Sequence, residues 1–342
     1  MKHKYWISLA TAVFVVQLYT PAPVFATPLL GTNLASFTVL GASTVTNVPT
    51  SAIGGNVAVW PSGGANAITG VNSSPGVAVS DPQVTGGNVH AGTALAQSAQ
   101  GELTIAMNNL GLLGPGTLLA ADLTGLTLFP GVYTVPAGTT NLAGVLTLDG
   151  LGNANAGWVF QMPSTLITSP NSVVNVVNTG SGAGVYWNVG SSATIDVNTT
   201  FLGNILALTS ITMNSFSSDL CGRALASTGA VTLNQNQLSG VCTDNLASSG
   251  GLSGGLDVTT TGSVSFLPYV PAAPVPEPAT MLLLGTGIAG LAGSRIKRKK
   301  NISSRNAGTA PAAFSLSVDI SAEQPHYGKG ERLCSEPSCS LS

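Results

Sequence analysis

The chain has 342 residues, and charged side chains make up only 7% of them, against about 25% in an average globular protein. Between Thr27 and Pro274 the sequence holds one cation, Arg223, and eight acids, so this stretch has a formal charge of 1 − 8 = −7. This charge argues against a nucleic-acid partner, which needs a basic surface, and the 44% apolar content argues against general disorder.

Residues 1–26 have the features of a secretory signal peptide. Lys2 and Lys4 precede an apolar region, and the small residues around Ala26 form a cleavage site, so the exported chain is expected to begin at Thr27. A transmembrane anchor is the weaker interpretation, because the apolar run is short and ends in prolines.

Residues 27–89 alternate short apolar segments with glycine-rich turns, which predicts short strands. The stretch from His90 to Leu113 is the only good candidate for a helix in the sequence. Its apolar stripe recurs every three or four residues and comprises Leu95, Ala99, Leu103, Met107 and Leu110. We expect this helix to lie along the side of a β domain and to bury the stripe there.

An imperfect repeat dominates the centre of the chain. The segments SSATIDVN, TSITMN and GAVTLN each alternate apolar and polar residues, and their central threonines are Thr194, Thr212 and Thr232. The threonines are separated by 212 − 194 = 18 and 232 − 212 = 20 residues. Several strand-like pieces in each repeat of this length predict a β-solenoid. In it the three threonines stack on an outer face, while the residues beside them point inward: Ile195, Ile211, Val231 and Leu233.

Cys221 and Cys242 are 242 − 221 = 21 residues apart, close to one repeat. An exported chain favours a disulfide between neighbouring coils. The alternative is two buried free thiols.

The C-terminal third changes character. Residues 245–274 are rich in Ser, Gly, Thr and Pro and are expected to form a linker with at most one weak strand. Within residues 275–300, an apolar segment over 279–293 precedes a basic cluster, which predicts a membrane segment with its basic end in the cytoplasm. Residues 301–342, with Cys334 and Cys339, form a polar tail for which disorder is the default expectation.

Catalytic and metal-binding patterns are missing from the sequence. It contains no GxSxG, HExxH or glycine-rich phosphate loop, and the acids are scattered singly. His90 is the one histidine between residues 27 and 274, and a structural role suits it best. We therefore expect neither a catalytic residue nor a metal or cofactor site.

The segment over 275–300 resembles a PEP-CTERM sorting signal, with Pro276-Glu277-Pro278 as its motif, followed by the apolar span and the basic end. This resemblance implies a Gram-negative bacterium, transient insertion in the inner membrane and processing by an exosortase. The protein is then secreted or held at the cell surface. Such signals usually end at the basic cluster, whereas this chain continues for 42 residues.

Residues 29–240 resemble the microbial ice-binding proteins. The matching phrases include LLGTNLASFTVLGASTVTN, GVLTLDGLGNANAGWVFQM and GRALASTGAVTLNQN. The resemblance implies a right-handed β-solenoid, dominated by β structure, with one long α-helix packed alongside, and it places the domain at residues 27–244. It also implies a flat ice-binding face, on which the charge of Asp196 would be a departure from the family: Thr139, Asn141, Thr165, Ile167, Ser192, Thr194, Ser210, Thr212, Asn214, Thr232 and Asn234.

The function that follows is an exported, monomeric protein that adsorbs to ice and limits its growth or recrystallisation. The alternative is a non-catalytic matrix or adhesion protein of a biofilm, which would use the same face to bind a polysaccharide. A polar outer face with many threonines is also ordinary for a strand-rich protein. What distinguishes this face is the scarcity of charge, since exposed surfaces normally carry Lys and Glu.

Overall fold

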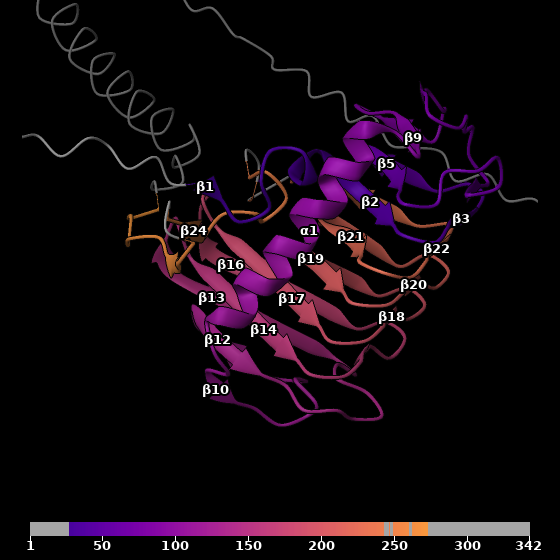
Figure 1. The fold of residues 1–342 in the computed structure, drawn as a ribbon. Helices are drawn as coiled ribbons and strands as arrows, with labels where there is room; N and C mark the ends of the chain where they lie inside the picture. The colour runs from indigo at the N-terminus through magenta and orange to yellow at the C-terminus, as the bar shows by residue number, and fades with distance from the viewer. Residues whose placement is uncertain (1–26, 243–245, 247–248, 260–261, 273–342) are drawn as a thin grey trace, which may run out of the picture. The chain divides into compact units, whose positions relative to one another are not determined.

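The alternating segments form short parallel strands that pair from one coil to the next, as a β-solenoid requires (Figure 1). The computed structural model describes residues 27–242, 246, 249–259 and 262–272. The predicted signal peptide, sorting signal and polar tail lie outside these residues. Within the described part, no helix is long and apolar enough to span a membrane.

Three sides of the solenoid are built from two large sheets. The side that the helix covers follows one path through the larger sheet: β10 (Thr117–Leu118), β12 (Gly131–Thr134), β14 (Gly157–Met162), β17 (Gly184–Val189), β19 (Thr200–Ala207), β21 (Ser218–Ala226), β2 (Phe37–Gly41), β5 (Asn56–Val59), β9 (Val89–Ala91) and β7 (Ala78–Val79). A second side branches from it: β11 (Thr127–Leu128), β13 (Val145–Asn153), β16 (Val173–Thr179), β23 (Gln237–Ser239), β4 (Ala52–Gly54) and β8 (Val84–Thr85).

The third side is a separate six-stranded sheet, which we call the six-stranded face. Its strands, in spatial order, are β15 (Leu166–Ile167), β18 (Ala193–Ile195), β20 (Ile211–Met213), β22 (Val231–Asn234), β3 (Val45–Val48) and β6 (Ile68–Thr69). The inward residues that the repeat predicts, Ile195, Ile211, Val231 and Leu233, are fully buried, which confirms the predicted alternation.

The coils are not stacked in chain order. The N-terminal strands β2, β3 and β4 pair with β21, β22 and β23 of the last repeat. The chain then leaves β9 through α1 (Ala94–Leu112) and continues at β10, at the opposite end of the larger sheet (Figure 1). The helix is therefore the return connection between the two ends of the stack.

Helix α1 lies along the larger sheet, as expected, but begins later than His90. Its N-cap is Thr93, whose hydroxyl accepts a hydrogen bond from the Ala96 amide. Three of its seven buried residues are alanines, which let the helix approach the sheet closely; the seven are Ala96, Ala99, Gln100, Leu103, Ala106, Asn109 and Leu110. Of the predicted stripe, Leu95 is 36% exposed, because the buried face is centred on the alanines.

His90 lies in β9 and packs edge-on against Phe37, with 5.4 Å between ring centroids. Burial lowers the pKa of His90, so the folded state favours the neutral ring. The stabilisation this gives is complete above the unfolded pKa of about 6.5 and is lost as the pH falls through the folded pKa. A His90→Gln variant should therefore lose less thermal stability than the parent between about pH 7.5 and pH 5. Equal losses in the two proteins would contradict this.

The segment predicted as a linker is structured over most of its length. β24 (Leu256–Val258) pairs with β1 (Thr27–Pro28) and β25 (Val264–Phe266) in a three-stranded antiparallel sheet. Leu252 and Leu256 are buried in the two apolar clusters of the domain. The Ala272 amide still donates to the Gly152 carbonyl oxygen, at 2.7 Å. The domain boundary expected at 244 is therefore wrong, because this segment supplies apolar side chains to the core.

A disulfide joins Cys221 of β21 to Cys242, so the thiols are not free. Beside it, Arg223 is 2% exposed and donates hydrogen bonds to the carbonyl oxygens of Ala35, Gly240 and Gly250. These contacts tie the N-terminal coil, the last repeat and the C-terminal segment together at the point where the chain order is broken.

Candidate functional site

The six-stranded face carries one threonine from each of five neighbouring strands. The register places Thr194 beside Thr212, Thr212 beside Thr232, Thr232 beside Thr46 and Thr46 beside Thr69. Neighbouring strands in a sheet lie about 4.8 Å apart, so these side chains form a regular row, which we call the threonine row. Ile167 of β15 continues the row at one end.

The row exists because each strand alternates around its threonine. On both sides of Thr232, for example, Val231 and Leu233 are fully buried, and Thr232 faces outward and is partly exposed. No hydrogen bond joins the five row hydroxyls to any other described residue. They are therefore available to order water at the surface.

The polar residues on either side of the row are bonded within the protein. The Ser192 and Ser210 hydroxyls accept hydrogen bonds from the amides of Ser210 and Ala230 in the next coil. The Asn234 amide group donates to the Ser215 hydroxyl, at 2.8 Å. The structure brings these predicted residues to the face, along with partly exposed Thr165, but the serine hydroxyls and the asparagine amide group also fix adjacent coils to one another.

Asp196 lies on the same side of the solenoid, two residues beyond Thr194. Its Oδ1 accepts hydrogen bonds from the Asn214 side chain, at 2.9 Å, and from the Val197 amide, at 2.8 Å. The carboxylate therefore flanks the threonine row without interrupting it.

Two predicted residues do not belong to the face. Asn141 is fully buried, and its side chain donates to the Ala121 carbonyl and accepts from the Ile167 amide. Thr139 is exposed but lies in a bend outside the strands of the sheet, ahead of β15 in the chain. Asn141 is buried because β15 is the edge of the sheet. Its side-chain oxygen accepts a hydrogen bond from the Ile167 amide, which a further strand would otherwise have bonded.

Thr46 and Thr69 were missed by the sequence analysis. The signal was present, since Thr44-Val45-Thr46-Asn47 has the same alternation as Ala230-Val231-Thr232-Leu233. It was overlooked because the repeat was followed in chain order, whereas the N-terminal strands stack on the last repeat.

A buried polar ladder runs beside this face at the corner that leads to the second side. Its members are Ser172, Thr199, Ser217, Asn236 and Ser51, each at most 3% exposed. Asn236 donates to the Ser217 carbonyl and hydroxyl, and the Asn236 amide donates to the Ser51 hydroxyl. Buried polar groups that bond from coil to coil fix the spacing of the strands, so the threonine row is held rigidly.

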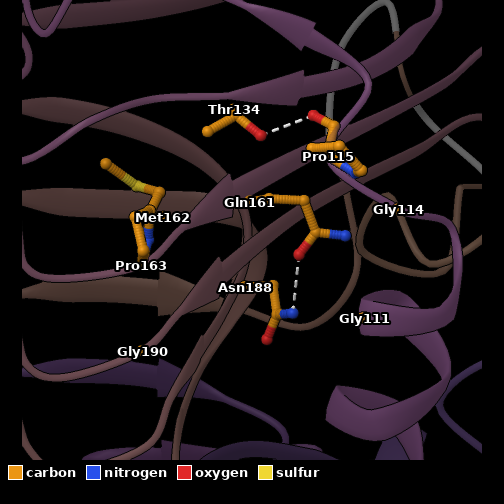
Figure 2. Close-up of a pocket in the computed structure, with 9 residues that line it drawn as sticks. All are labelled: Gly111, Gly114, Pro115, Thr134, Gln161, Met162, Pro163, Asn188 and Gly190. Atoms are coloured by element: carbon orange, nitrogen blue, oxygen red, sulfur yellow. Dashed lines mark hydrogen bonds between the residues drawn. The ribbon is translucent and has the colours of Figure 1, made fainter.

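A pocket of about 450 Å³ lies at the C-terminal end of α1 (Figure 2). The Asn188 side chain donates to Gln161 Oε1 at 2.9 Å, and Gln161 Nε2 donates to the Leu110 carbonyl, at 2.6 Å. None of the residues lining it is an acid, a histidine, a lysine or a cysteine. The pocket thus provides no general base or activated nucleophile, and within the described residues no cluster of metal ligands is found.

Comparison with known proteins gives two family matches. Residues 39–239 match the model described as ice-binding-like, and residues 274–299 match the PEP-CTERM protein-sorting motif. An ice-binding protein of Nostoc sp. (strain HG1) is 40% identical over 243 residues, which cover 71% of this chain and 84% of the relative. Ice-binding protein K3-B1 of Typhula ishikariensis is 31% identical and covers 60% of this chain and 86% of its own length.

Solved structures agree with the fold. The ice-binding protein of the Antarctic ascomycete Antarctomyces psychrotrophicus has a TM-score of 0.54 at 29% identity, covering 63% of this chain and 98% of that one. An ice-binding protein from an Antarctic biological consortium has a TM-score of 0.52 at 31% identity, covering 68% and 96%. With its β-solenoid, its flanking helix and these matches, the chain belongs to the ice-binding-like family and carries a PEP-CTERM sorting motif at its C-terminal side.

Proposed function

We propose that this protein is exported and binds ice through the six-stranded face. The observation that supports this most strongly is the threonine row, with five in-register threonines whose hydroxyls have no partner among the described residues. Each threonine offers a methyl group, which orders water by apolar hydration, and a hydroxyl, which anchors it by hydrogen bonds. Water arranged in this way can join an ice plane, and the adsorbed protein then stops local growth of the crystal.

Rigidity and low charge support the same proposal. The polar ladder and the coil-to-coil bonds of Ser192 and Ser210 hold the face in one conformation, so little entropy is lost on adsorption. The row itself contains no charged side chain, whose hydration shell would compete with an ice-like arrangement of water. No chemical reaction forms part of the proposal, and the protein acts as a monomer.

The sorting motif suggests how the protein reaches its place of action. We propose that the signal peptide is removed after Ala26, that the apolar segment inserts transiently in the inner membrane of a Gram-negative bacterium, and that an exosortase cleaves near Pro276-Glu277-Pro278. The solenoid is then secreted or held at the cell surface. Residues 301–342 have no role in the proposal.

Partition of the purified solenoid into slowly growing ice tests ice binding against the matrix alternative. The protein should be enriched in the ice fraction, and added soluble polysaccharide should not compete. Exclusion from ice together with retention on a polysaccharide column would instead establish the matrix reading.

Asp196 is expected to weaken ice binding, because its carboxylate keeps a hydration shell at the margin of the row. An Asp196→Asn variant should bind ice more strongly than the parent, measured as recrystallisation inhibition at equal concentration. Its Oδ1 can still accept from Asn214 and Val197, so stability should change by no more than about 0.5 kcal/mol. Weaker inhibition by this variant would show that the charge contributes to binding.

A further inference from the structure

The first described residues form a strand at the point where the signal-peptide cleavage proposed above creates a new chain end, and the present inference rests on that cleavage. β1 pairs antiparallel with β24, placing Thr27 opposite Val258 and Pro28 opposite Asp257. Signal peptidase hydrolyses the Ala26–Thr27 peptide bond with one water molecule. This leaves a carboxylate on Ala26 and an α-ammonium group on Thr27. The cleavage therefore places a new positive charge at the start of β1.

Asp257 is positioned to meet that charge. Its Oδ1 is buried and has no hydrogen-bond partner among the described residues. A pocket of about 330 Å³ lies beside it, lined also by Pro28, and its other lining residues are glycine, serine and leucine, all uncharged. A buried carboxylate oxygen without a partner is costly, which indicates that a donor belongs at this position in the finished protein.

The register brings the two groups within reach. Residues directly opposite each other in an antiparallel pair have Cβ atoms about 4.5–5.5 Å apart on the same face, so the Asp257 carboxylate lies next to Pro28. The nitrogen of Thr27 is one residue further along the same strand. In the uncleaved chain this nitrogen is a neutral amide, and after cleavage it is a cation with three donors.

We propose that the α-ammonium group of Thr27, once signal peptidase has produced it, pairs with the Asp257 carboxylate and locks β1 onto β24. The lock joins the start of the exported chain to the C-terminal segment, which Leu256 anchors in the core beneath α1 and which Arg223 holds through Gly250. Export thereby stabilises the domain, independently of ice binding.

The test compares two forms of the chain that both run to Ser342, with Cys221 and Cys242 oxidised. One begins at Thr27 and the other has an added Gly-Ser before Thr27, each verified by mass spectrometry. At about pH 6 the extension should lower the melting temperature by about 2–4 °C, the shift expected for one modest ion pair in a domain of this size. At about pH 10 the difference should vanish, because an α-amino group has a pKa of about 8.

Asp257→Asn provides the matched control. In that background the extension should leave the melting temperature unchanged at either pH, because the carboxylate is gone. If the extension lowers the melting temperature equally in both backgrounds, or equally at both pH values, its effect is steric and the proposal is overturned. The proposal is also overturned if the extension does not lower the melting temperature at all. If Asp257→Asn does not fold, acetylation of Thr27 removes the charge without adding a residue. It should lower the melting temperature as the extension does, and an unchanged temperature would overturn the proposal.

Discussion

Replacing Thr232 with lysine should abolish adsorption to ice and leave the fold intact. Thr232 lies in the middle of the threonine row, between Thr212 and Thr46. A lysine ammonium group there is strongly hydrated and protrudes from the flat surface, so an ice plane can no longer approach. Because the side chain faces outward and makes no hydrogen bond within the described residues, stability should change by only about 0.5 kcal/mol. Partition into growing ice and a melting curve measure the two effects.

Two controls isolate the face. Thr200, the first residue of β19, is exposed where that strand pairs with Val173 of β16 on the second side of the solenoid, and Thr200→Lys should retain full ice adsorption. Val231→Lys, one residue from Thr232, puts a charge in the core and should unfold the domain. If Thr232→Lys still partitions into ice and Thr200→Lys does not, the second side is the binding face and our assignment is wrong.

Removing the Arg223 side chain should cost more stability than any surface change, on the order of 3–5 kcal/mol for Arg223→Ala. Its guanidinium donates to the Ala35 carbonyl at 2.7 Å, to Asn204 Oδ1 at 2.9 Å and to the Gly250 carbonyl at 3.0 Å. Loss of the side chain leaves Asn204 Oδ1 buried without a donor and removes the hydrogen bonds to the Ala35 and Gly250 carbonyl oxygens. Burial lowers the pKa of Arg223 to about 10, so the side chain is charged at neutral pH.

Arg223→Lys separates charge from geometry. A lysine retains the positive charge but presents a single ammonium group, which cannot reach the three segments together, so its melting temperature should fall between those of the parent and Arg223→Ala. Burial raises the pKa of the neighbouring Asp219 carboxyl well above its usual range. A fall of less than about 2 °C for Arg223→Ala would show that Arg223 does not hold the coils together.

Local alternation and spacing were sufficient to predict the coils. The segments around Thr194, Thr212 and Thr232 repeat at nearly equal intervals, and this periodicity is a property of single strands and of neighbours in the chain. The helix was predicted for the same reason. Its start was wrong because His90 belongs to β9, where contact with Phe37, a residue distant in sequence, outweighs the apolar period.

Long-range pairing could not be predicted in the same way. The row gains Thr46 and Thr69 because β3 pairs with β22, nearly 190 residues later in the chain. Asn141 was misplaced because its burial depends on β15 being the edge of the sheet. The segment around Leu256 has a linker-like composition, and only its contacts with the core and with β1 give it structure.

The central claim is that the isolated solenoid acts on ice, and recrystallisation inhibition by purified residues 27–272 tests it most directly. This fragment contains the helix, both apolar clusters, the disulfide and the complete threonine row. Our account predicts that micromolar protein keeps ice grains small during annealing just below the melting point, and that Thr232→Lys does not. Grain growth at the rate of a buffer control, with the protein folded and at high micromolar concentration, would contradict the account.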